Sequence, residues 1–232
     1  MSFDIRTVRA SDYVVAAICG CWKRESSVNP GIWESLIVCP WDYMHTQNPL
    51  AGGYGFGQWT NTHVTNMRCL NLHNYVTSHG YADGDGRGQI MFLGEEDIWN
   101  DYGSQFSLPY RSLEAFLNAD STDLPALVHD FLMGWEGVPG DAYQERLEAA
   151  QRFLTYIRQH ANDNPADYAT AISRNGYLSD AEMLHNVMFV YFALNGYLGS
   201  PSMDAATFIM LSIGGKRRRG GRFNANNTRR KL

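Results

Sequence analysis

The chain has 232 residues, of which 44% are apolar and 13% aromatic, so it can bury the core of one domain and still carry an extension. No apolar run has the length of a membrane span, and the first residues lack the basic and apolar segments of a secretory signal. We therefore expect the protein to stay in the cytoplasm where it is made, unless a virion or a holin-type route carries it out. All 24 acidic residues precede Lys216, whereas eight of the 19 basic residues lie in the last 17 positions, so a body of about −13 precedes a tail of +8.

The first predicted element is a helix over residues 11–25. Its apolar positions Val14, Ile18, Cys21 and Trp22 have the spacing i, i+4, i+7 and i+8, and Glu25 at i+11 continues the same face. An Asn-Pro-Gly turn at residues 29–31 ends the helix. Burial and the negative end of the helix dipole both favour the neutral acid, as a general acid requires. The structural alternative is a carboxylate that is capped by a buried arginine.

A run of glycines and aromatic residues follows at residues 52–60, with Tyr54, Phe56 and Trp59 interleaved between glycines. Glycine lets a backbone approach a ligand closely, and flat aromatic faces beside polar amides suit sugars. The alternative is a plain glycine-rich hairpin.

Together these segments resemble the phage tail lysozyme domain, a family of the wider lysozyme and lytic transglycosylase group. The resemblance rests on Glu25-Ser26, on the Asn29-Pro30 turn with Trp33 after it, and on Gly53-Tyr54-Gly55-Phe56-Gly57-Gln58-Trp59-Thr60. It continues in Phe131, Trp135-Glu136, Arg146 and Ala150 and covers about residues 12–160. It implies a mainly α (α+β) fold, a lysozyme-like helical domain with a small β-hairpin region.

The resemblance also implies a glycosidase that cleaves the glycan strand of bacterial peptidoglycan. Glu25 would be the catalytic general acid, and the substrate-binding residues would be Ser26, Trp33, Tyr54, Gly55, Gln58 and Trp59. Hydrolysis also needs a group that holds water on the opposite face of the sugar. The candidates for that group are Glu34, Asp42, Asp83, Asp85, Glu95 and Glu96. A single-acid mechanism that forms an anhydro product, as in lytic transglycosylases, stays open.

The middle of the chain is predicted to be mostly helical. A helix capped by Thr60 or Asn61 extends to about residue 78, a loop covers residues 80–88, and Glu95 opens another helix. Residues 124–135 form a strongly amphipathic helix. Asp141 then caps a helix that extends to about residue 160.

The best domain boundary is the polar stretch at residues 161–165. We expect a lysozyme-like catalytic domain over residues 1–160, a helical extension over residues 161–213 and a basic, disordered tail over residues 214–232. Within the extension, Ser179 caps a helix that extends to about Leu194, and residues 203–213 form a further helix. Residues 183–197 look like a helix that the family places before the catalytic one. They complete the first domain, or they form a separate docking hairpin for a partner.

Three function classes are consistent with these features: a peptidoglycan-cleaving enzyme, a wall-binding tail protein without activity, and a nucleic-acid-associated virion protein. The enzyme is favoured, as a virion component (tail or inner virion) that opens the cell wall during infection rather than an endolysin acting at lysis. Other virion or tail proteins are expected partners, and the basic tail would contact nucleic acid or an acidic protein surface. The cysteine and histidine spacings match no metal motif, so neither a metal nor a cofactor is expected.

Overall fold

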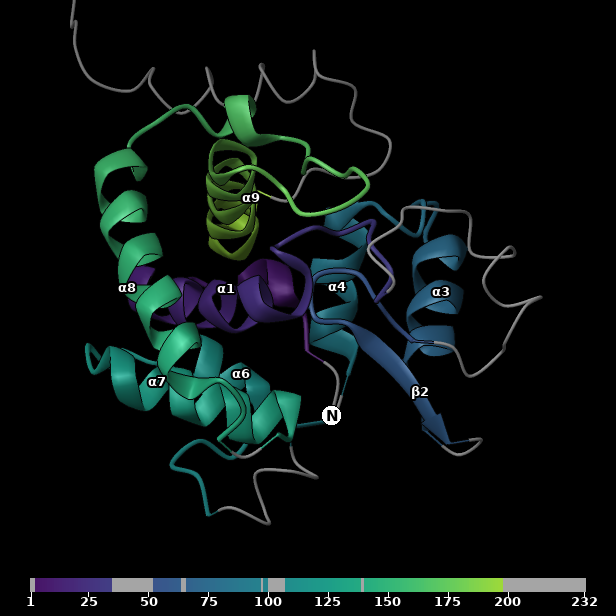
Figure 1. The fold of residues 1–232 in the computed structure, drawn as a ribbon, viewed down its shortest axis with the longest axis horizontal. Helices are drawn as coiled ribbons and strands as arrows, with labels where there is room; N and C mark the ends of the chain where they lie inside the picture. Colours follow the sequence, from purple (N-terminus) through teal and green to yellow (C-terminus); the bar gives the residue numbers. More distant parts are fainter. Residues whose placement is uncertain are drawn as a thin grey trace, which may run out of the picture.

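The computed structural model describes residues 3–34, 52–63, 66–96, 98–99, 107–138 and 140–197. Figure 1 shows α1 (Asp12–Ser26) at the centre, with α9 (Asp180–Phe192) above it and α6 (Leu113–Leu117) and α7 (Leu124–Phe131) below it. The helices α3 (Arg68–Ser78) and α4 (Gly86–Glu95) lie with the small sheet to one side (Figure 1). The fold is therefore mainly helical with a small antiparallel sheet, as the sequence predicted.

The predicted N-terminal helix is confirmed as α1. Ser11 caps it by accepting a hydrogen bond from the Val14 amide at 3.2 Å, and the backbone turns left-handed at Ser27 (φ 56°), which ends the helix. The apolar stripe of α1 lies in the core against α7, α8 and α9. A Cβ on Gly20 would lie 2.7 Å from the Ala150 Cβ, so α1 and α8 (Tyr143–His160) approach each other closely because residue 20 has no side chain.

The glycine-aromatic run forms a short antiparallel sheet in the order β1-β2-β3. Strand β1 (Gly53–Tyr54) pairs with β2 (Trp59–His63), which pairs with β3 (Asn66–Met67). The predicted helix start at residue 60 or 61 is therefore wrong, since α3 begins at Arg68. The Asn61 side chain does act as an acceptor, but for the Leu70 amide inside α3 at 3.1 Å.

Residues 86–88 form the first turn of α4, although the sequence predicted them to belong to a loop. Asp85 caps this helix by accepting from the Arg87 amide at 2.9 Å. Its glycines allow close packing and do not form a loop. A Cβ on Gly86 would lie 2.8 Å from Phe189, and a Cβ on Gly88 would lie 2.9 Å from Tyr81. Such packing leaves no signal in the local pattern.

The predicted amphipathic helix of residues 124–135 is confirmed as α7, which continues directly into the π-helical segment η2 (Leu132–Glu136). Helix α8 also ends at the expected residue, but Asp141 does not cap it, because Ala142 occupies the cap position without a side-chain hydrogen bond.

Elements from both ends of the described chain meet around α1. Helix α9, capped by Ser179 as predicted, lies against α1 and α8 and shares their hydrophobic core. Its Asn186 donates to the Val28 carbonyl at 2.7 Å, just after α1. Near the N-terminal segment η1 (Ile5–Thr7), the Ala10 amide donates at 3.3 Å to Leu194 in η4 (Ala193–Tyr197). The helix therefore packs on the N-terminal domain rather than standing apart from it.

The segment η3 (Pro165–Tyr168) completes the described elements and contacts α9. The predicted helix over residues 203–213 and the basic tail lie outside the described residues. No helix in the described ranges combines the length and the apolar character that crossing a bilayer requires.

Candidate active site

The last turn of α1 carries Glu25 to the rim of the core. The neighbouring Ser26 hydroxyl is buried and donates to the Phe56 carbonyl at 2.7 Å, while its oxygen accepts from the Asn29 amide at 3.3 Å. These bonds join the helix end to the glycine-aromatic run, and so hold the Glu25 backbone in a fixed position relative to the sheet. The Glu25 side chain itself keeps 24% of its surface exposed.

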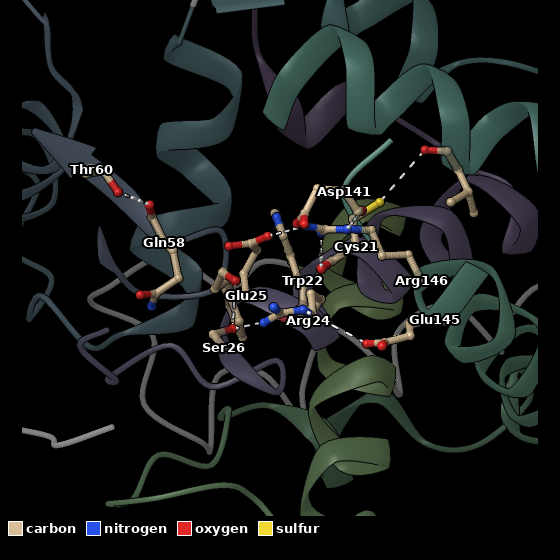
Figure 2. A network of polar contacts seen from close by, with 12 residues as sticks. Cys21, Trp22, Arg24, Glu25, Ser26, Gln58, Thr60, Asp141, Glu145 and Arg146 are labelled. Carbon is tan, nitrogen blue, oxygen red and sulfur yellow. Dashed lines mark hydrogen bonds and ion pairs between the residues drawn. The ribbon is translucent and has the colours of Figure 1, made fainter. Parts of the chain in front are cut away.

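A cleft of about 610 Å³ opens at this junction. Figure 2 shows Arg146 on one side of the Glu25 carboxylate and Gln58 on the other. The cleft is lined by residues from α1, the sheet, α3, the turn after η2 and the extension, namely Arg24, Glu25, Glu34, Gly53, Gly57, Gln58, Thr60, Arg68, Glu136, Gly137, Val138, Asp141 and Tyr177. Its lining is rich in polar and charged groups, as a site for a hydroxylated substrate requires.

Arg146, a fully buried residue of α8, contacts Glu25 directly. Its guanidinium donates to the Cys21 carbonyl at 2.8 Å, to the Asp141 carbonyl at 3.0 Å and to the Asp141 carboxylate at 2.9 Å. The remaining bond is an ion pair with Glu25 (Figure 2). The buried arginine that sequence analysis named as the structural alternative is thus present beside the cleft.

Glu136 is a second carboxyl group of the cleft. It ends the π-helical segment η2, and Gly137 after it is left-handed (φ 69°). The residue is half-buried, but its Oε1 is shielded from solvent and has no hydrogen-bond partner in the described part of the chain. Burial raises the pKa of Glu136 well above its ordinary value, and the charge of Glu25 raises it further.

Arg68 and Glu96 form a largely buried ion pair beside this carboxyl group. The Arg68 guanidinium donates to Glu96 at 2.9 and 3.1 Å, and the Trp59 indole donates to the same carboxylate at 2.8 Å. The guanidinium also lies over the Trp135 ring, 4.6 Å from its centroid, which is a cation–π contact. The pair therefore packs against Trp135, the residue just before Glu136 in the cleft wall.

Of the predicted substrate-binding residues, Gln58 lines the cleft. Its backbone is left-handed (φ 48°), which is rare for a residue other than glycine, and its Nε2 donates to the Ile32 and Gly55 carbonyls at 3.2 and 3.1 Å. This strained position holds the side chain toward the space beside Glu25.

The other predicted substrate-binding residues lie behind the cleft wall. Trp33 and Tyr54 are buried with their ring centroids 4.6 Å apart, and Trp59 is buried against Trp22 and Trp135. Gly55 is left-handed (φ 80°) and its amide donates to the Ile32 carbonyl at 2.9 Å. Ser26 is also buried, and its hydroxyl donates to the Phe56 carbonyl. A sugar could touch these residues only if the core opened, whereas Gln58 already lines the cleft.

The six candidates for a water-holding carboxylate are placed differently. Glu34 lines the cleft and accepts from the Gly53 amide at 3.3 Å. Asp83 pairs with His73 at 2.7 Å, Asp85 pairs with Arg87, also at 2.7 Å, and Glu96 is held by Arg68. Glu95 lines a separate cavity near the N-terminus, and Asp42 lies outside the described residues. No cluster of metal-binding side chains is found among the residues described.

Sequence reasoning missed Tyr177, which comes from the extension. Its side chain is 67% exposed and borders the cleft. The segment is held to the end of α1, because Asn29 donates to the Arg174 carbonyl at 2.8 Å and Arg174 donates to the Tyr177 carbonyl at 3.1 Å. An exposed aromatic ring at a cleft is a sugar-binding signal, but only the folded chain brings it there.

Comparison with known families agrees with this geometry. The family model described as phage tail lysozyme matches residues 4–157, about two thirds of the chain and every cleft residue except Tyr177. The curated proteins contain no match to this chain. With its helix-end glutamate beside a glycine-rich sheet in an open polar cleft, the chain belongs to the phage tail lysozyme family.

Proposed function

We propose that the cleft cleaves the glycan strand of peptidoglycan by hydrolysis, with Glu25 as the general acid. The observation that carries this proposal is the position of Glu25: it ends a rigid, buried helix, yet keeps 24% of its side chain exposed inside a cleft of about 610 Å³. The family itself suggests a lysozyme-like function that degrades peptidoglycan. It also suggests a phage virion protein.

Glu25 protonates the oxygen of the leaving sugar as positive charge develops on the anomeric carbon. Glu34, which lines the same cleft, is our choice for the carboxylate that holds the attacking water. Its hydrogen bond from the Gly53 amide ties it to the sheet, so both carboxyl groups are carried by ordered backbone. Water adds its oxygen to the anomeric carbon and releases one proton, which restores the acid.

Polar and aromatic groups of the cleft hold the sugar. The side-chain oxygens of Gln58 and Thr60 offer acceptors to sugar hydroxyls, because Gln58 Nε2 donates to the Ile32 and Gly55 carbonyls and the Thr60 hydroxyl donates to the backbone carbonyl of Gln58 at 2.7 Å. Tyr177 supplies a flat aromatic face at the other border of the cleft.

Clearing of purified cell walls by the wild type and by Glu25→Gln tests the proposal. We expect the substitution to abolish most clearing without unfolding the protein, because the amide keeps the shape of the side chain but cannot donate a proton as an acid. Glu148→Gln, at an exposed position of α8, is the matched control and should clear walls normally. Equal clearing by wild type and Glu25→Gln, or none by the wild type, would refute an enzymatic role.

Mass spectrometry of the released fragments identifies the reaction. Reducing ends are expected for hydrolysis, whereas fragments that have lost one water would make the protein a lytic transglycosylase. Immunoblotting of purified particles tests where the enzyme acts. We expect it in the particles, as a virion component that opens the wall during infection, whereas absence from particles with abundance late in lysis would make it an endolysin.

A further inference from the structure

The carboxyl groups around the cleft have very unequal hydrogen-bond partners. Arg146 donates hydrogen bonds to both Glu25 and Asp141, and Arg68 donates to Glu96. Glu34 accepts from a backbone amide. Glu136 differs from all of these, because its shielded Oε1 accepts no hydrogen bond from any residue that the structure describes.

The backbone holds Glu136 in this unfavourable position. It lies at the end of a π-helical segment, a rare local structure that occurs preferentially at functional sites. The turn is fixed by its neighbours, since the Trp135 ring stacks on Phe131 with centroids 5.2 Å apart and the Gly137 amide donates to the Leu132 carbonyl at 3.0 Å. The backbone of Glu136 is therefore held at the cleft wall by packed neighbours.

An ionised carboxylate needs several donors, and placing one in a shielded position without them is costly. The usual outcome is that the group keeps its proton. Glu25 has the opposite surroundings, because a buried guanidinium contacts it directly. The two carboxyl groups of one cleft therefore have contrasting electrostatic surroundings, and such a contrast separates catalytic roles in glycosidases.

We propose that Glu136 is the proton store of the cleft: Glu25 and Glu136 share one exchangeable proton, which Glu136 holds in the free enzyme and Glu25 delivers to the leaving oxygen. This inference rests on the proposed glycosidase function. Glu136 acts through Glu25 and is therefore a positioning residue for the proton rather than a group that touches the scissile bond.

The proton balance of one turnover is simple. The O–H bond of Glu136 breaks and the proton moves through the cleft to Glu25, which leaves Glu136 ionised beside two guanidinium groups, Arg146 and Arg68. Glu25 then gives the proton to the glycosidic oxygen as the bond to the anomeric carbon breaks. The water that attacks this carbon loses one proton, which returns to the pair.

The charged and titratable groups that face Glu136 come from four elements: Cys21 and Glu25 on α1, Arg68 on α3, Glu96 after α4, and Arg146 on α8. The cleft adds Arg24, Glu34 and Asp141. Among them, Arg68 and Arg146 favour ionisation of Glu136, while Glu25 and Glu96 oppose it.

The test is the pH profile of kcat/KM on soluble glycan fragments for the wild type, Glu25→Gln, Glu136→Gln and the control Glu148→Gln. Without the second carboxyl group, Glu25 must take its proton from the solvent, which supplies it more readily at lower pH. We expect Glu136→Gln to lose activity roughly a hundredfold near neutral pH and to regain most of it at acidic pH. The optimum should therefore move to lower pH, while Glu148→Gln keeps the wild-type profile.

Two outcomes overturn the proposal while leaving the glycosidase function intact. One is an unchanged profile in Glu136→Gln, and the other is a uniform loss of activity without any shift in its optimum, which would indicate a structural role only. If instead the wild type fails to cleave, or Glu25→Gln is fully active, the proposed function itself is refuted.

A second measurement does not depend on turnover. NMR titration of carbon-labelled glutamate side chains, with Glu25→Gln and Glu136→Gln used for assignment, should show that the two carboxyl groups titrate as a coupled pair, with each substitution shifting the other signal. A Glu136 signal that titrates in the ordinary carboxyl range and ignores Glu25→Gln would refute the shared proton.

Discussion

Arg146 donates a hydrogen bond to Glu25 from a position 121 residues further along the chain. The arginine is fully buried, whereas the glutamate is partly exposed in the cleft, so the pair joins the core to the site. Because Arg146 also donates to the Cys21 carbonyl in α1, it holds both the backbone of this helix and the Glu25 carboxylate. This one guanidinium therefore supports the fold and the electrostatics of the site at once.

Substituting Arg146 should destabilise the protein strongly. Arg146→Met keeps much of the volume but leaves Glu25, Asp141 and the Cys21 carbonyl without their donor, and breaking such a buried pair costs about 3–5 kcal/mol. Arg152→Met on the same helix breaks an exposed pair with Asp180 and an exposed cation–π contact with Phe153, and should cost about 1 kcal/mol or less. Urea unfolding of both variants measures the difference, and equal losses would contradict a special role for Arg146.

The raised pKa of Glu136 predicts how stability depends on pH. A carboxyl group whose pKa is higher in the folded state binds more protons there than in the unfolded chain, so folding stability falls as pH rises above the ordinary value of 4.5. The slope from one group is at most about 1.4 kcal/mol per pH unit. Glu136→Gln should flatten this slope and match or exceed the wild type in stability at pH 7. Urea unfolding between pH 4 and pH 8 checks this, and a variant with the wild-type slope would contradict it.

Tyr177 should contribute to substrate binding rather than to chemistry. Its exposed ring borders the cleft, and loss of an aromatic contact costs about 0.5–1.5 kcal/mol, so Tyr177→Ala should raise KM on glycan fragments by roughly three- to tenfold with little change in kcat. Tyr177→Phe should behave as the wild type. Tyr197→Ala is the control, since this tyrosine is 50% exposed but lies away from the cleft beside Phe192. Similar kinetics for the two alanine variants would argue against a sugar platform.

Gly20 should tolerate no side chain. In Gly20→Ala the new methyl group would lie 2.7 Å from the Ala150 Cβ and from the Arg146 carbonyl, so α1 and α8 must separate at a cost of about 1–3 kcal/mol. Because Arg146 is carried by α8, activity should fall together with stability. Gly80→Ala meets no atom within 4 Å and introduces only the strain of a left-handed residue (φ 77°), so it should leave activity unchanged. Thermal unfolding and wall clearing of both variants provide the comparison.

The basic tail is expected to anchor the protein rather than to act in catalysis. Removing the residues after Ile213 deletes eight positive charges and no acidic group. Turnover on short, uncharged glycan fragments should therefore stay nearly constant, while incorporation into particles or binding to nucleic acid weakens. Binding by the full chain should fall steeply with salt, because each neutralised phosphate releases counterions. A truncated protein that folds normally but loses most of its turnover would place the tail in the active site.

The sequence predicted the helices whose apolar residues recur at a regular spacing. The spacing of Val14, Ile18 and Trp22 was enough to place α1 and to put Glu25 on its buried face, and α7 followed from the same periodicity. Helix α4 was missed because its glycines pack against Phe189 and Tyr81, contacts that are distant in sequence. Long-range folding also decides which side chains reach the cleft. Trp33 and Trp59 were predicted to bind the sugar but lie in the core. Glu136, which the sequence offered only as part of the family pattern, and Tyr177, for which it offered no signal, both line the cleft.

Helix α9 is synthesised long after α1, the helix against which it packs. The bond from Asn186 to the Val28 carbonyl spans 158 residues, and the one from Asn195 to the Ala10 carbonyl spans 185. On the ribosome, the apolar surface of α1 that α9 covers stays uncovered until these residues have been synthesised. At synthesis rates of about 5–20 residues per second, the 37 positions from residue 157 to residue 194 delay closure by roughly 2–7 seconds. During this interval the nascent chain carries Glu25 on an unfinished core, so the candidate site is complete only once α9 has been synthesised.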